Sequence, residues 1–242
     1  MIVSETAERV GLVAIDRHER RNALDVDHCD ALREALGKLA AGGSRAIVIT
    51  GRGTSFCAGA DLGGVYGDGF RTALYAMLST ITSLPIPVIA AVNGPAIGAG
   101  AQLAVACDLR VAAPQARFAI PTARNGLAVD PWTIRRVALL AGGGAARAML
   151  LGCAELDSGQ AQSLGLVDRI GDLDNALAWA GEITGFAPFS LRYAKNALES
   201  LLEPRPWPVG LDEQFEQCWA SDDFAESQRA RTEKRAPRFT GR

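Results

Sequence analysis

The spacing of hydrophobic residues differs between three consecutive segments in the first part of the chain, and it predicts a strand, a helix and a second strand. Apolar residues fill positions 10–15 and predict a strand. Residues 46–49 form a continuous apolar run, as expected for a strand buried on both faces. Between these strands, apolar residues recur every three or four positions after Asp25, which is a suitable helix cap. The helix predicted over 26–39 carries them at Val26, Cys29, Leu32, Leu36 and Leu39.

Strands and helices continue to alternate up to about residue 111, and the later part of the chain is mostly helical. It predicts a helix over 73–81, a strand over 88–92, a helix of small residues beginning near Gly98, and a strand over 109–111. Strand–helix alternation is typical of an α/β core. From about residue 131 the pattern becomes helical, with helices expected at 134–141, 145–151, 158–164, 176–183 and 191–202 and a short strand at 166–167.

The C-terminal part has a different composition from the rest of the chain. Prolines at 204, 206 and 208 predict a turn before a final amphipathic stretch. We therefore expect an α/β core over residues 1–190 and a helical C-terminal extension over residues 191–242.

Residues 72–107 contain no charged side chain and no histidine, so the possibility of a membrane helix has to be tested. A spanning helix needs about 20 consecutive apolar residues. Prolines and glycines interrupt this stretch repeatedly, and it carries several Ser and Thr. We therefore expect no membrane span, and we interpret the segment as the buried centre of a soluble fold.

Charge and cysteine content exclude several classes of function. Lys and Arg number 25 against 27 Asp and Glu, so the charge gives no reason to expect nucleic acid as a partner. Five cysteines without a C-x-x-C pair, and only two histidines, argue against a metal site. No G-x-S-x-G motif indicates a serine hydrolase. No signal peptide is recognised, which favours a cytoplasmic protein with reduced thiols.

Two glycine-rich turns are the main candidates for a site. Each begins with G-x-G, at 51–53 and 98–100, but neither has the third glycine of a dinucleotide-binding loop. Taken together they follow two consecutive buried strands, and turns of small residues let backbone N–H groups approach a ligand closely. Two such turns aimed at one point would form an oxyanion hole. Close helix–strand packing explains the small residues equally well.

A set of motifs in a fixed order resembles the crotonase (enoyl-CoA hydratase/isomerase) superfamily. The motifs are R-N-A-L at 21–24, F-C-A-G-A-D-L at 56–62 and A-V-N-G-P-A-I-G-A-G at 91–100. The similarity continues at 107–110, 116–118, 164–167 and 233–239, and so covers nearly the whole chain.

The resemblance implies a fold, an assembly and a ligand. The fold would be an α/β spiral of β-β-α turns, assembled as a homotrimer or a dimer of trimers. The ligand would be an acyl-CoA thioester whose oxygen lies between the backbone N–H groups of Ala60 and Ala99. No separate cofactor is implied, because coenzyme A enters as part of the ligand. The implied CoA-binding residues are Arg21, Ala23, Ala58, Ala60, Asp61 and Leu62.

The chain departs from the hydratase pattern at two positions. Hydratases of the superfamily use two glutamates to hold and activate water, and here Gln102 and Thr122 occupy these positions. Glutamine can bind a water molecule but cannot accept its proton at neutral pH. The resemblance therefore predicts an acyl-CoA-binding protein of fatty-acid metabolism whose hydratase activity is weak or absent.

Asp130 is the one carboxylate that keeps an enzymatic alternative open. It falls where some isomerases and a dehalogenase of the superfamily place a catalytic Asp, so the alternative is an active hydratase or a double-bond isomerase. Pro131 follows it directly, which makes Asp130 a natural helix cap, and the two roles are compatible. Trp132 is a candidate for the acyl pocket or for the core. The surrounding G-L-A-x-D-x-W-x-I-R-R also resembles a subgroup linked to long-chain and mycolic-acid lipid metabolism.

The basic C-terminal tail also has two interpretations. A solvated helix face is the ordinary one. In the superfamily the C-terminal region often completes a CoA site, so contact with the CoA 3′-phosphate is the functional alternative. The residues concerned are Arg229, Arg231, Lys234, Arg235, Arg238 and Arg242.

Overall fold

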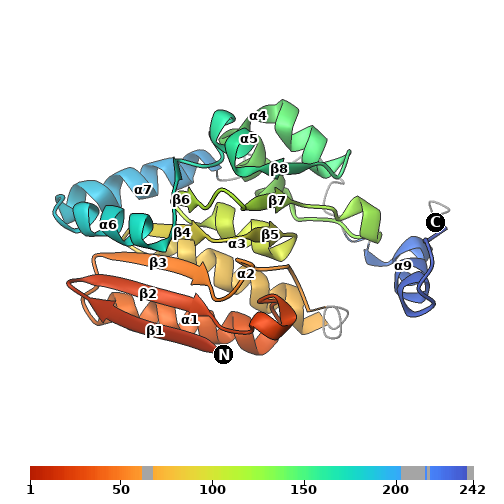
Figure 1. Ribbon diagram of the computed structural model, residues 1–242, viewed down its shortest axis with the longest axis horizontal. Helices are drawn as coiled ribbons and strands as arrows, with labels where there is room; N and C mark the ends of the chain where they lie inside the picture. The colour runs from red at the N-terminus through yellow and green to blue at the C-terminus, as the bar shows by residue number, and fades with distance from the viewer. Residues whose placement is uncertain (62–67, 203–215, 217–218, 239–242) are drawn as a thin grey trace.

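The described part of the chain forms two β-sheets, and the larger has six strands and is almost entirely parallel (Figure 1). The computed structural model describes residues 1–61, 68–202, 216 and 219–238. Only the first two strands pair antiparallel, and each later pair is parallel. In sheet order the strands are β1 (Ile2–Ala7), β2 (Val10–Ile15), β3 (Ala46–Gly51), β4 (Val88–Val92), β6 (Leu109–Ala112) and β9 (Arg169–Ile170).

A smaller sheet is formed by three short strands. β5 (Pro95–Ile97) pairs parallel with β7 (Arg117–Ala119), and β7 pairs antiparallel with β8 (Glu155–Asp157). The chain passes from the larger sheet to the smaller one at residues 93–94, between β4 and β5. The second glycine-rich turn, which begins at Gly98, follows directly after β5.

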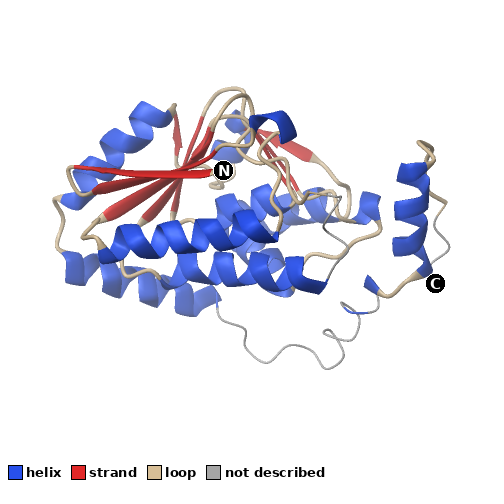
Figure 2. Cartoon of the chain, turned by 90° about the horizontal axis from the view of Figure 1, so that it is seen from below, coloured by secondary structure: helices blue, strands red, loops and turns tan. Residues whose placement is uncertain are grey.

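Helices lie on both sides of the larger sheet (Figure 2). Most of these helices lie where the spacing of apolar residues predicted them. Two one-turn 3₁₀ helices lie at His18–Arg20 and Ala123–Asn125. The helices are α1 (Val26–Ala41), α2 (Asp68–Ser83), α3 (Ala99–Ala106), α4 (Pro131–Leu150), α5 (Ser158–Ser163), α6 (Leu173–Thr184), α7 (Pro188–Leu202) and α9 (Asp222–Thr232).

The central strands β3 and β4 are buried along their whole length because helices cover both of their faces. In β3, Ala46 and Val48 share a cluster with Ala176 and Ala180 of α6. Ile47 and Ile49 belong instead to the main core, which includes the buried faces of α1, α2 and α3. Alternate residues of a strand point to opposite faces, so a strand covered on both sides needs no polar positions.

Helix starts agree with the predicted caps. The Asp25 carboxylate accepts a hydrogen bond from the His28 N–H at 2.9 Å and begins α1. Asp130 caps α4 in the same way, with Pro131 in the first turn. The two helices expected at 134–141 and 145–151 are one element, α4, interrupted at Gly142, where φ is +83°.

The expected strand at 166–167 is wrong. Leu166 and Val167 are buried, but both of their N–H groups donate to the Ala161 carbonyl and close a turn after α5. The strand follows two residues later as β9 and pairs with β6. The apolar pair reflects burial rather than an extended backbone.

Polar bonds hold α7 against the core. The buried Lys195 ammonium donates to the Ile81 and Ile86 carbonyls, at 2.9 and 3.0 Å, and to the Asp108 carboxylate at 2.8 Å. Glu199 pairs with the buried guanidinium of Arg136 on α4. The division expected between residues 190 and 191 falls inside α7. In the described parts of the chain, no helix combines the length and hydropathy of a bilayer-spanning segment.

Candidate functional site

Backbone hydrogen bonds join the two glycine-rich turns along Cys57. The Cys57 N–H donates to the Pro95 carbonyl at 3.1 Å, and its carbonyl accepts from the Ile97 N–H at 3.0 Å. A Cβ atom on Gly100 would overlap the Cys57 carbonyl, and one on Gly94 would overlap the Thr54 carbonyl. The turns therefore meet at van der Waals distance, as the small-residue pattern predicted.

Two glycines in the left-handed half of conformational space set the direction of the following N–H groups. Gly59 has a φ of +107° and Gly98 a φ of +55°. A Cβ on Gly59 would lie 2.8 Å from the Ile97 carbonyl oxygen and 3.8 Å from the Ala99 nitrogen. Any L-residue there would be strained and would push the second turn away.

The N–H groups of Ala60 and Ala99, directly after these glycines, are unpaired. Among the described residues, neither group donates to a backbone or side-chain acceptor. Ala99 is the first residue of α3, where an N–H has no acceptor within the helix, and its φ is negative. Both residues line one cavity of about 140 Å³.

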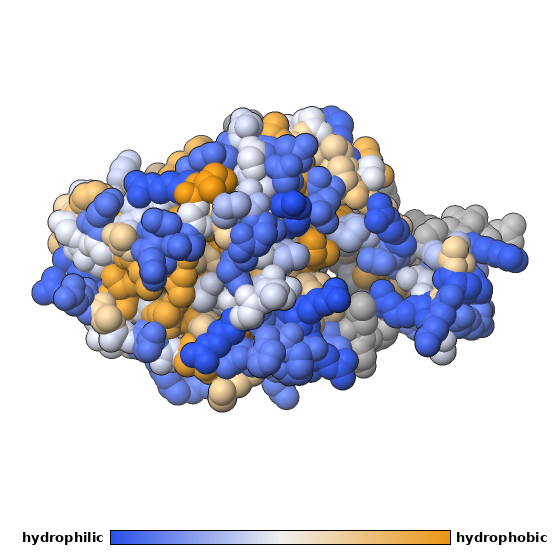
Figure 3. Space-filling model, viewed as in Figure 1, coloured by the Kyte–Doolittle hydropathy of each residue, from blue (hydrophilic) through white to orange (hydrophobic). Residues whose placement is uncertain are grey.

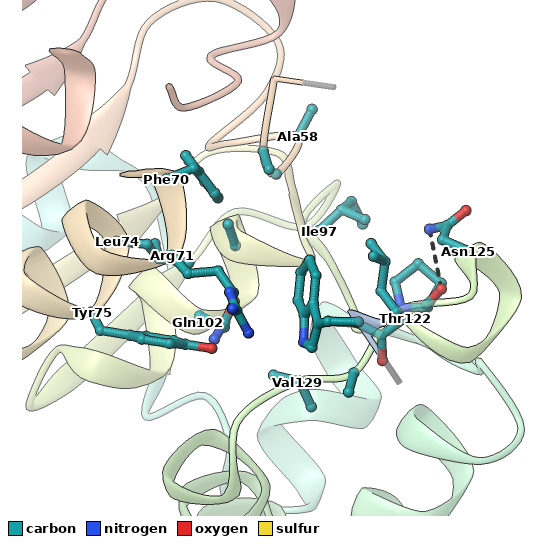
Figure 4. Close-up of a pocket in the computed structure, with 18 of the residues that line it drawn as sticks. Ala58, Phe70, Arg71, Leu74, Tyr75, Ile97, Gln102, Thr122, Asn125 and Val129 are labelled. Carbon is teal, nitrogen blue, oxygen red and sulfur yellow. Dashed lines mark hydrogen bonds between the residues drawn. The ribbon is translucent and has the colours of Figure 1, made fainter. Parts of the chain in front are cut away.

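That cavity is mostly apolar, and its described lining contains no carboxylate (Figure 4). Phe70, Leu74 and Val129 contribute apolar walls, while Arg71 and Arg231 are the charged residues among the described ones. Gln102 and Thr122, at the positions of the family's hydratase acids, both line it. The other lining residues include Ala58, Tyr75, Ile97, Pro121, Asn125, Leu127, Ala128 and Trp219.

Two residues that do not line this cavity, Asp130 and Thr133, fix the Gln102 side chain by hydrogen bonds. Its Nε2 atom donates to the Asp130 Oδ2 atom and to the Thr133 hydroxyl, both at 2.9 Å. The Gln102 side chain is buried, at 7% exposure for the whole residue, so these bonds form away from water. The sequence identified Gln102 and Asp130 separately and did not predict that they touch.

Asp130 contacts Gln102 and lines a neighbouring cavity, not the cavity that holds the Ala60 and Ala99 N–H groups (called the main cavity below). Its Oδ1 atom accepts from the Thr133 N–H at 2.9 Å, and its Oδ2 atom accepts from the Thr133 hydroxyl at 2.6 Å as well as from Gln102. The neighbouring cavity, of about 240 Å³, is lined by Asp130, Trp132 and Tyr75. Trp132 therefore lies beside the second cavity, with the Arg136 guanidinium 5.0 Å from its ring centre.

The R-N-A-L segment supports the first turn through its backbone and Asn22. Asn22 is fully buried, and its amide donates to the Arg52 and Ser55 carbonyls at 2.8 and 2.7 Å. The Arg21 carbonyl accepts from the Ala58 N–H at 3.0 Å, while the Arg21 side chain is exposed. Ala23, in the same segment, is half-buried.

Arg17 is a residue of the site region that the sequence did not single out. Its guanidinium pairs with Asp61 at 2.8 Å and with Asp25 at 3.1 Å. Asp61 is thus tied to the segment that carries R-N-A-L. Leu62, expected to contact CoA, lies outside the described residues.

Tyr75 and Arg71 of α2 were also not singled out. Burial raises the pKa of the Tyr75 phenol, so Tyr75 stays neutral, and its hydroxyl points into the cavity (Figure 4). Arg71 pairs with Glu216 at 3.3 Å and stacks on Trp219. A helix over 73–81 was predicted, but its periodicity cannot tell which residues line a cavity and which fill the core.

Cys57 is fully buried where the two turns meet. Burial raises the pKa of its thiol to about 12, so the thiolate is scarce at neutral pH. Asn93 links the two turns by donating from its side-chain amide to the Gly53 carbonyl at 2.9 Å.

Two of the basic tail residues, Arg229 and Arg235, pair with carboxylates of the tail itself. Glu226 accepts from Arg235 at 2.5 Å and from Arg229 at 3.1 Å, and Arg235 lowers the pKa of this carboxylate to about 2. Side chains of α9 give a mostly hydrophilic surface, at the right of Figure 3. Arg231 differs because it lines the main cavity, whereas Arg242 lies outside the described residues.

Comparison with known proteins agrees with this geometry. The family profile described as "Enoyl-CoA hydratase/isomerase" matches residues 5–242. The chain belongs to the enoyl-CoA hydratase/isomerase family. It is 46% identical to "Probable enoyl-CoA hydratase echA6" of Mycobacterium tuberculosis over the full length of both chains. It is 36% identical to "Probable enoyl-CoA hydratase" of Rhodobacter capsulatus, over 98% of this chain and 97% of the relative.

Solved structures of similar proteins share the fold. An enoyl-CoA hydratase/isomerase from Pseudoalteromonas atlantica is 29% identical, with a TM-score of 0.86 over 99% of both chains. A methylmalonyl-CoA decarboxylase aligns with a TM-score of 0.92, over 100% of this chain and 98% of that one, at 22% identity. The expected crotonase-like α/β fold is therefore confirmed.

Proposed function

We propose that the protein binds an acyl-CoA thioester, with the N–H groups of Ala60 and Ala99 donating to the thioester oxygen. This proposal rests on one observation: the N–H groups of Ala60 and Ala99 line the same cavity, and neither has an acceptor among the described residues. Two donors beside a mainly apolar wall suit a carbonyl oxygen followed by an acyl chain. Family membership supports the thioester as the ligand class.

The rest of the ligand follows from the surroundings of these donors. Arg21, Ala23, Ala58 and Asp61 are proposed to contact CoA on the side where R-N-A-L meets the first turn. Arg231 adds a positive charge at the cavity, which favours a CoA phosphate. Coenzyme A is then part of the ligand, and no separate cofactor is proposed.

Hydration is proposed to be weak or absent. No carboxylate is found among the described residues that line the cavity, and neither Gln102 nor Thr122 can accept a proton from water at neutral pH. The Asp130 alternative, a double-bond isomerase, has less support. Both oxygens of Asp130 already accept hydrogen bonds, and Asp130 lines the neighbouring cavity. We therefore favour an acyl-CoA binder acting in cytoplasmic fatty-acid metabolism.

We propose the family's homotrimer, or a dimer of trimers, as the assembly. The exposed apolar side chains of Phe189, Tyr193 and Leu198 on α7 are consistent with a surface covered by another subunit. The C-terminal extension, residues 191–242, would then join the contact between subunits and complete the CoA site.

Removal of one N–H group tests the binding proposal directly. Proline is well accepted at the first position of a helix, so Ala99→Pro should fold while losing the donor. We expect its affinity for butyryl-CoA, measured by calorimetric titration, to fall about tenfold or more. Ala99→Gly keeps the N–H and should bind within about threefold of the original protein.

S-Butyl-CoA, which has no carbonyl oxygen, is the matched ligand control. Its affinity should differ little between the Gly and Pro variants at position 99. Equal binding of butyryl-CoA by a folded Ala99→Pro variant and the original protein would contradict the proposed role of this N–H. A thermal melt of each variant establishes that it is folded.

A hydration assay tests the second half of the proposal. With crotonyl-CoA we expect a kcat more than tenfold below ~10 s⁻¹, the median for enzymes. The reason is that each positioned acid or base typically contributes ~10²–10⁴-fold, and both are missing. Loss of the absorbance of the conjugated thioester measures the rate. A kcat near the median would show that another group activates water.

A further inference from the structure

Two side chains of α2 bring hydrogen-bond donors to the main cavity. Arg71 and Tyr75 are four residues apart, so they lie one turn apart on the same face of the helix. Both line the cavity, together with the apolar side chains of Phe70 and Leu74 from the same helix. Figure 4 shows the Arg71 guanidinium and the Tyr75 hydroxyl reaching into the space that these residues surround. A charged donor and a neutral donor therefore face one small, mostly apolar space.

The Tyr75 hydroxyl is a donor that lacks an acceptor. Burial raises the pKa of the phenol and keeps it protonated at neutral pH, so Tyr75 has a hydrogen to donate. Within the described residues, this hydroxyl has no hydrogen-bond partner. A half-buried donor without an acceptor is unfavourable, so a ligand that supplies an oxygen at this place gains affinity.

The Arg71 guanidinium is paired, but its ion pair is easily rearranged. Its nitrogens lie 3.3–3.5 Å from the Glu216 oxygens, longer than the about 2.7–2.9 Å of a strong charge-assisted bond. The Glu216 side chain is 63% exposed, and exposed ion pairs contribute little to stability. The Trp219 ring lies 4.7 Å from the guanidinium carbon. A guanidinium has five N–H groups, so Arg71 can exchange Glu216 for another anion or bind both.

The charge of the cavity favours an anion, and the position of Arg71 indicates which part of the ligand carries it. Arg71 and Arg231 are the charged residues of the described lining, which includes no carboxylate. Arg231 comes from α9, on the part of the cavity proposed for CoA. Arg71 instead shares α2 with Phe70 and Leu74, which form the apolar wall proposed for the acyl group. An anion bound by Arg71 would therefore belong to the acyl group.

We propose that the Arg71 guanidinium and the Tyr75 hydroxyl bind a carboxylate at the end of the acyl chain, so that the protein selects short dicarboxylic acyl-CoA thioesters. This inference rests on the proposed binding of the thioester oxygen by Ala60 and Ala99. The planar fork of a guanidinium matches both oxygens of a carboxylate. The cavity holds about 140 Å³, and a cavity of about 150 Å³ is enough for benzene. The acyl group would then have about three to five carbons.

Asp130 is the negative charge closest to this arrangement that acts on Tyr75, where it contributes to the raised pKa of the phenol. Its carboxylate accepts hydrogen bonds from the Thr133 N–H and hydroxyl and from the Gln102 amide. Asp130 also lines the neighbouring cavity. These three donors offset its charge, so Asp130 opposes a carboxylate in the main cavity only weakly.

Titration of paired CoA esters tests the proposal on the intact protein. The pairs have equal numbers of acyl carbons: malonyl- and propionyl-CoA, succinyl- and butyryl-CoA, and glutaryl- and pentanoyl-CoA. We expect at least one dicarboxylic ester to bind about tenfold or more tightly than its partner, because it gains a bidentate ion pair and a hydrogen bond. The monomethyl ester of the preferred acid, which has no charge, should lose this advantage.

Three variants should change the ratio of affinities within the preferred pair, and not all in the same direction. Arg71→Met removes the charge at similar length, so the ratio should fall to near one. Tyr75→Phe removes one neutral donor, so the ratio should fall by about threefold or more. Glu216→Gln removes the carboxylate that competes for Arg71, so the ratio should rise. A structural role of Arg71 would not produce these opposite changes.

Arg33→Met is the matched control, because Arg33 forms an exposed ion pair on α1 and is not in the described lining of the cavity. It should leave every ratio unchanged. Equal binding within all three pairs would overturn this inference and leave acyl-CoA binding intact. If Arg71→Met weakened both members of a pair equally, Arg71 would bind a CoA phosphate, and the inference would also be wrong. Failure of every ester to bind would remove the proposed function and this inference together.

Discussion

Replacing both Gln102 and Thr122 with glutamate is expected to raise crotonyl-CoA hydratase activity by at least ~10²-fold over either single replacement. Both positions line the cavity that holds the unpaired N–H groups of Ala60 and Ala99. The two acids would act on the same water molecule, so their effects should be strongly non-additive. The measurement is kcat/KM for crotonyl-CoA in the double variant and in each single variant.

Because Asp130 lies next to position 102, the hydratase activity gained by the double variant should depend on pH. A carboxylate at position 102 would take the place of an amide nitrogen 2.9 Å from Asp130 Oδ2. Two carboxylates so close cannot both ionise easily, so the pKa of the pair is raised. Hydratase activity of the double variant should therefore increase as the pH rises through the raised pKa, because the base must be ionised.

Adding Asp130→Asn removes the repulsion and gives a control within the same site. The amide introduced at position 130 would donate to the carboxylate introduced at position 102 and hold it ionised. The triple variant should then reach its full rate at lower pH than the double variant. Simple addition of the single effects, in a folded double variant that still binds butyryl-CoA, would show that the positions no longer share a water molecule.

The largest loss of stability is expected from Asp108→Ala. Asp108 accepts from the buried Lys195 ammonium at 2.8 Å and from the Val88 N–H at 2.7 Å. Removing one partner of a buried pair typically costs about 3–5 kcal/mol, because the other charge stays buried. The Lys195 side chain is only 4% exposed, so water cannot replace the lost carboxylate. Urea denaturation measures the change in the free energy of unfolding.

A solvent-exposed ion pair provides the comparison for the buried Asp108–Lys195 pair. Asp30 and Arg33 form a 3.2 Å ion pair on α1 with side chains 49% and 48% exposed. Asp30→Ala should change the free energy of unfolding by less than about 1 kcal/mol. Adding Lys195→Met to Asp108→Ala should recover part of the loss, since it removes the unpaired charge. Equal effects of Asp108→Ala and Asp30→Ala would refute the interpretation of Lys195 as a buried anchor of α7.

Local patterns were enough to predict four strands of the larger sheet, β2, β3, β4 and β6, and the helices between them. The Asp25 cap and the three- and four-residue spacing that follows it give α1 almost to its ends. The strand expected at 88–92 is β4 without change. Both are long or strongly periodic, and local propensity agrees with burial in each.

The second sheet was not predicted, because its strands are too short to show a period. β5, β7 and β8 have three residues each, and their pairing joins segments far apart in the chain. The strand wrongly expected at 166–167 has the same origin, since two buried apolar residues do not distinguish a turn from a strand. Tertiary contacts alone decide these segments.

The sequence predicted only the parts of the candidate site that lie within short, continuous segments. Motif order identified the two turns and the positions of Gln102 and Thr122, because these features are local. Arg17, Tyr75 and the contact between Gln102 and Asp130 depend on segments separated by tens of residues. One sequence without its relatives contains no signal for such pairs.

The close approach of the two turns also limits how the protein can evolve. Gly94 and Gly100 each leave no room for a Cβ beside the carbonyls of Thr54 and Cys57. A mutation to a larger residue in one turn has to be accompanied by a shift in the other, and that shift would move an N–H group out of the cavity. Aligned sequences should therefore keep both glycines even in lineages that have changed the residues at 102, 122 and 130. In this fold, geometry for holding a carbonyl would then outlast the acid–base chemistry that it once served.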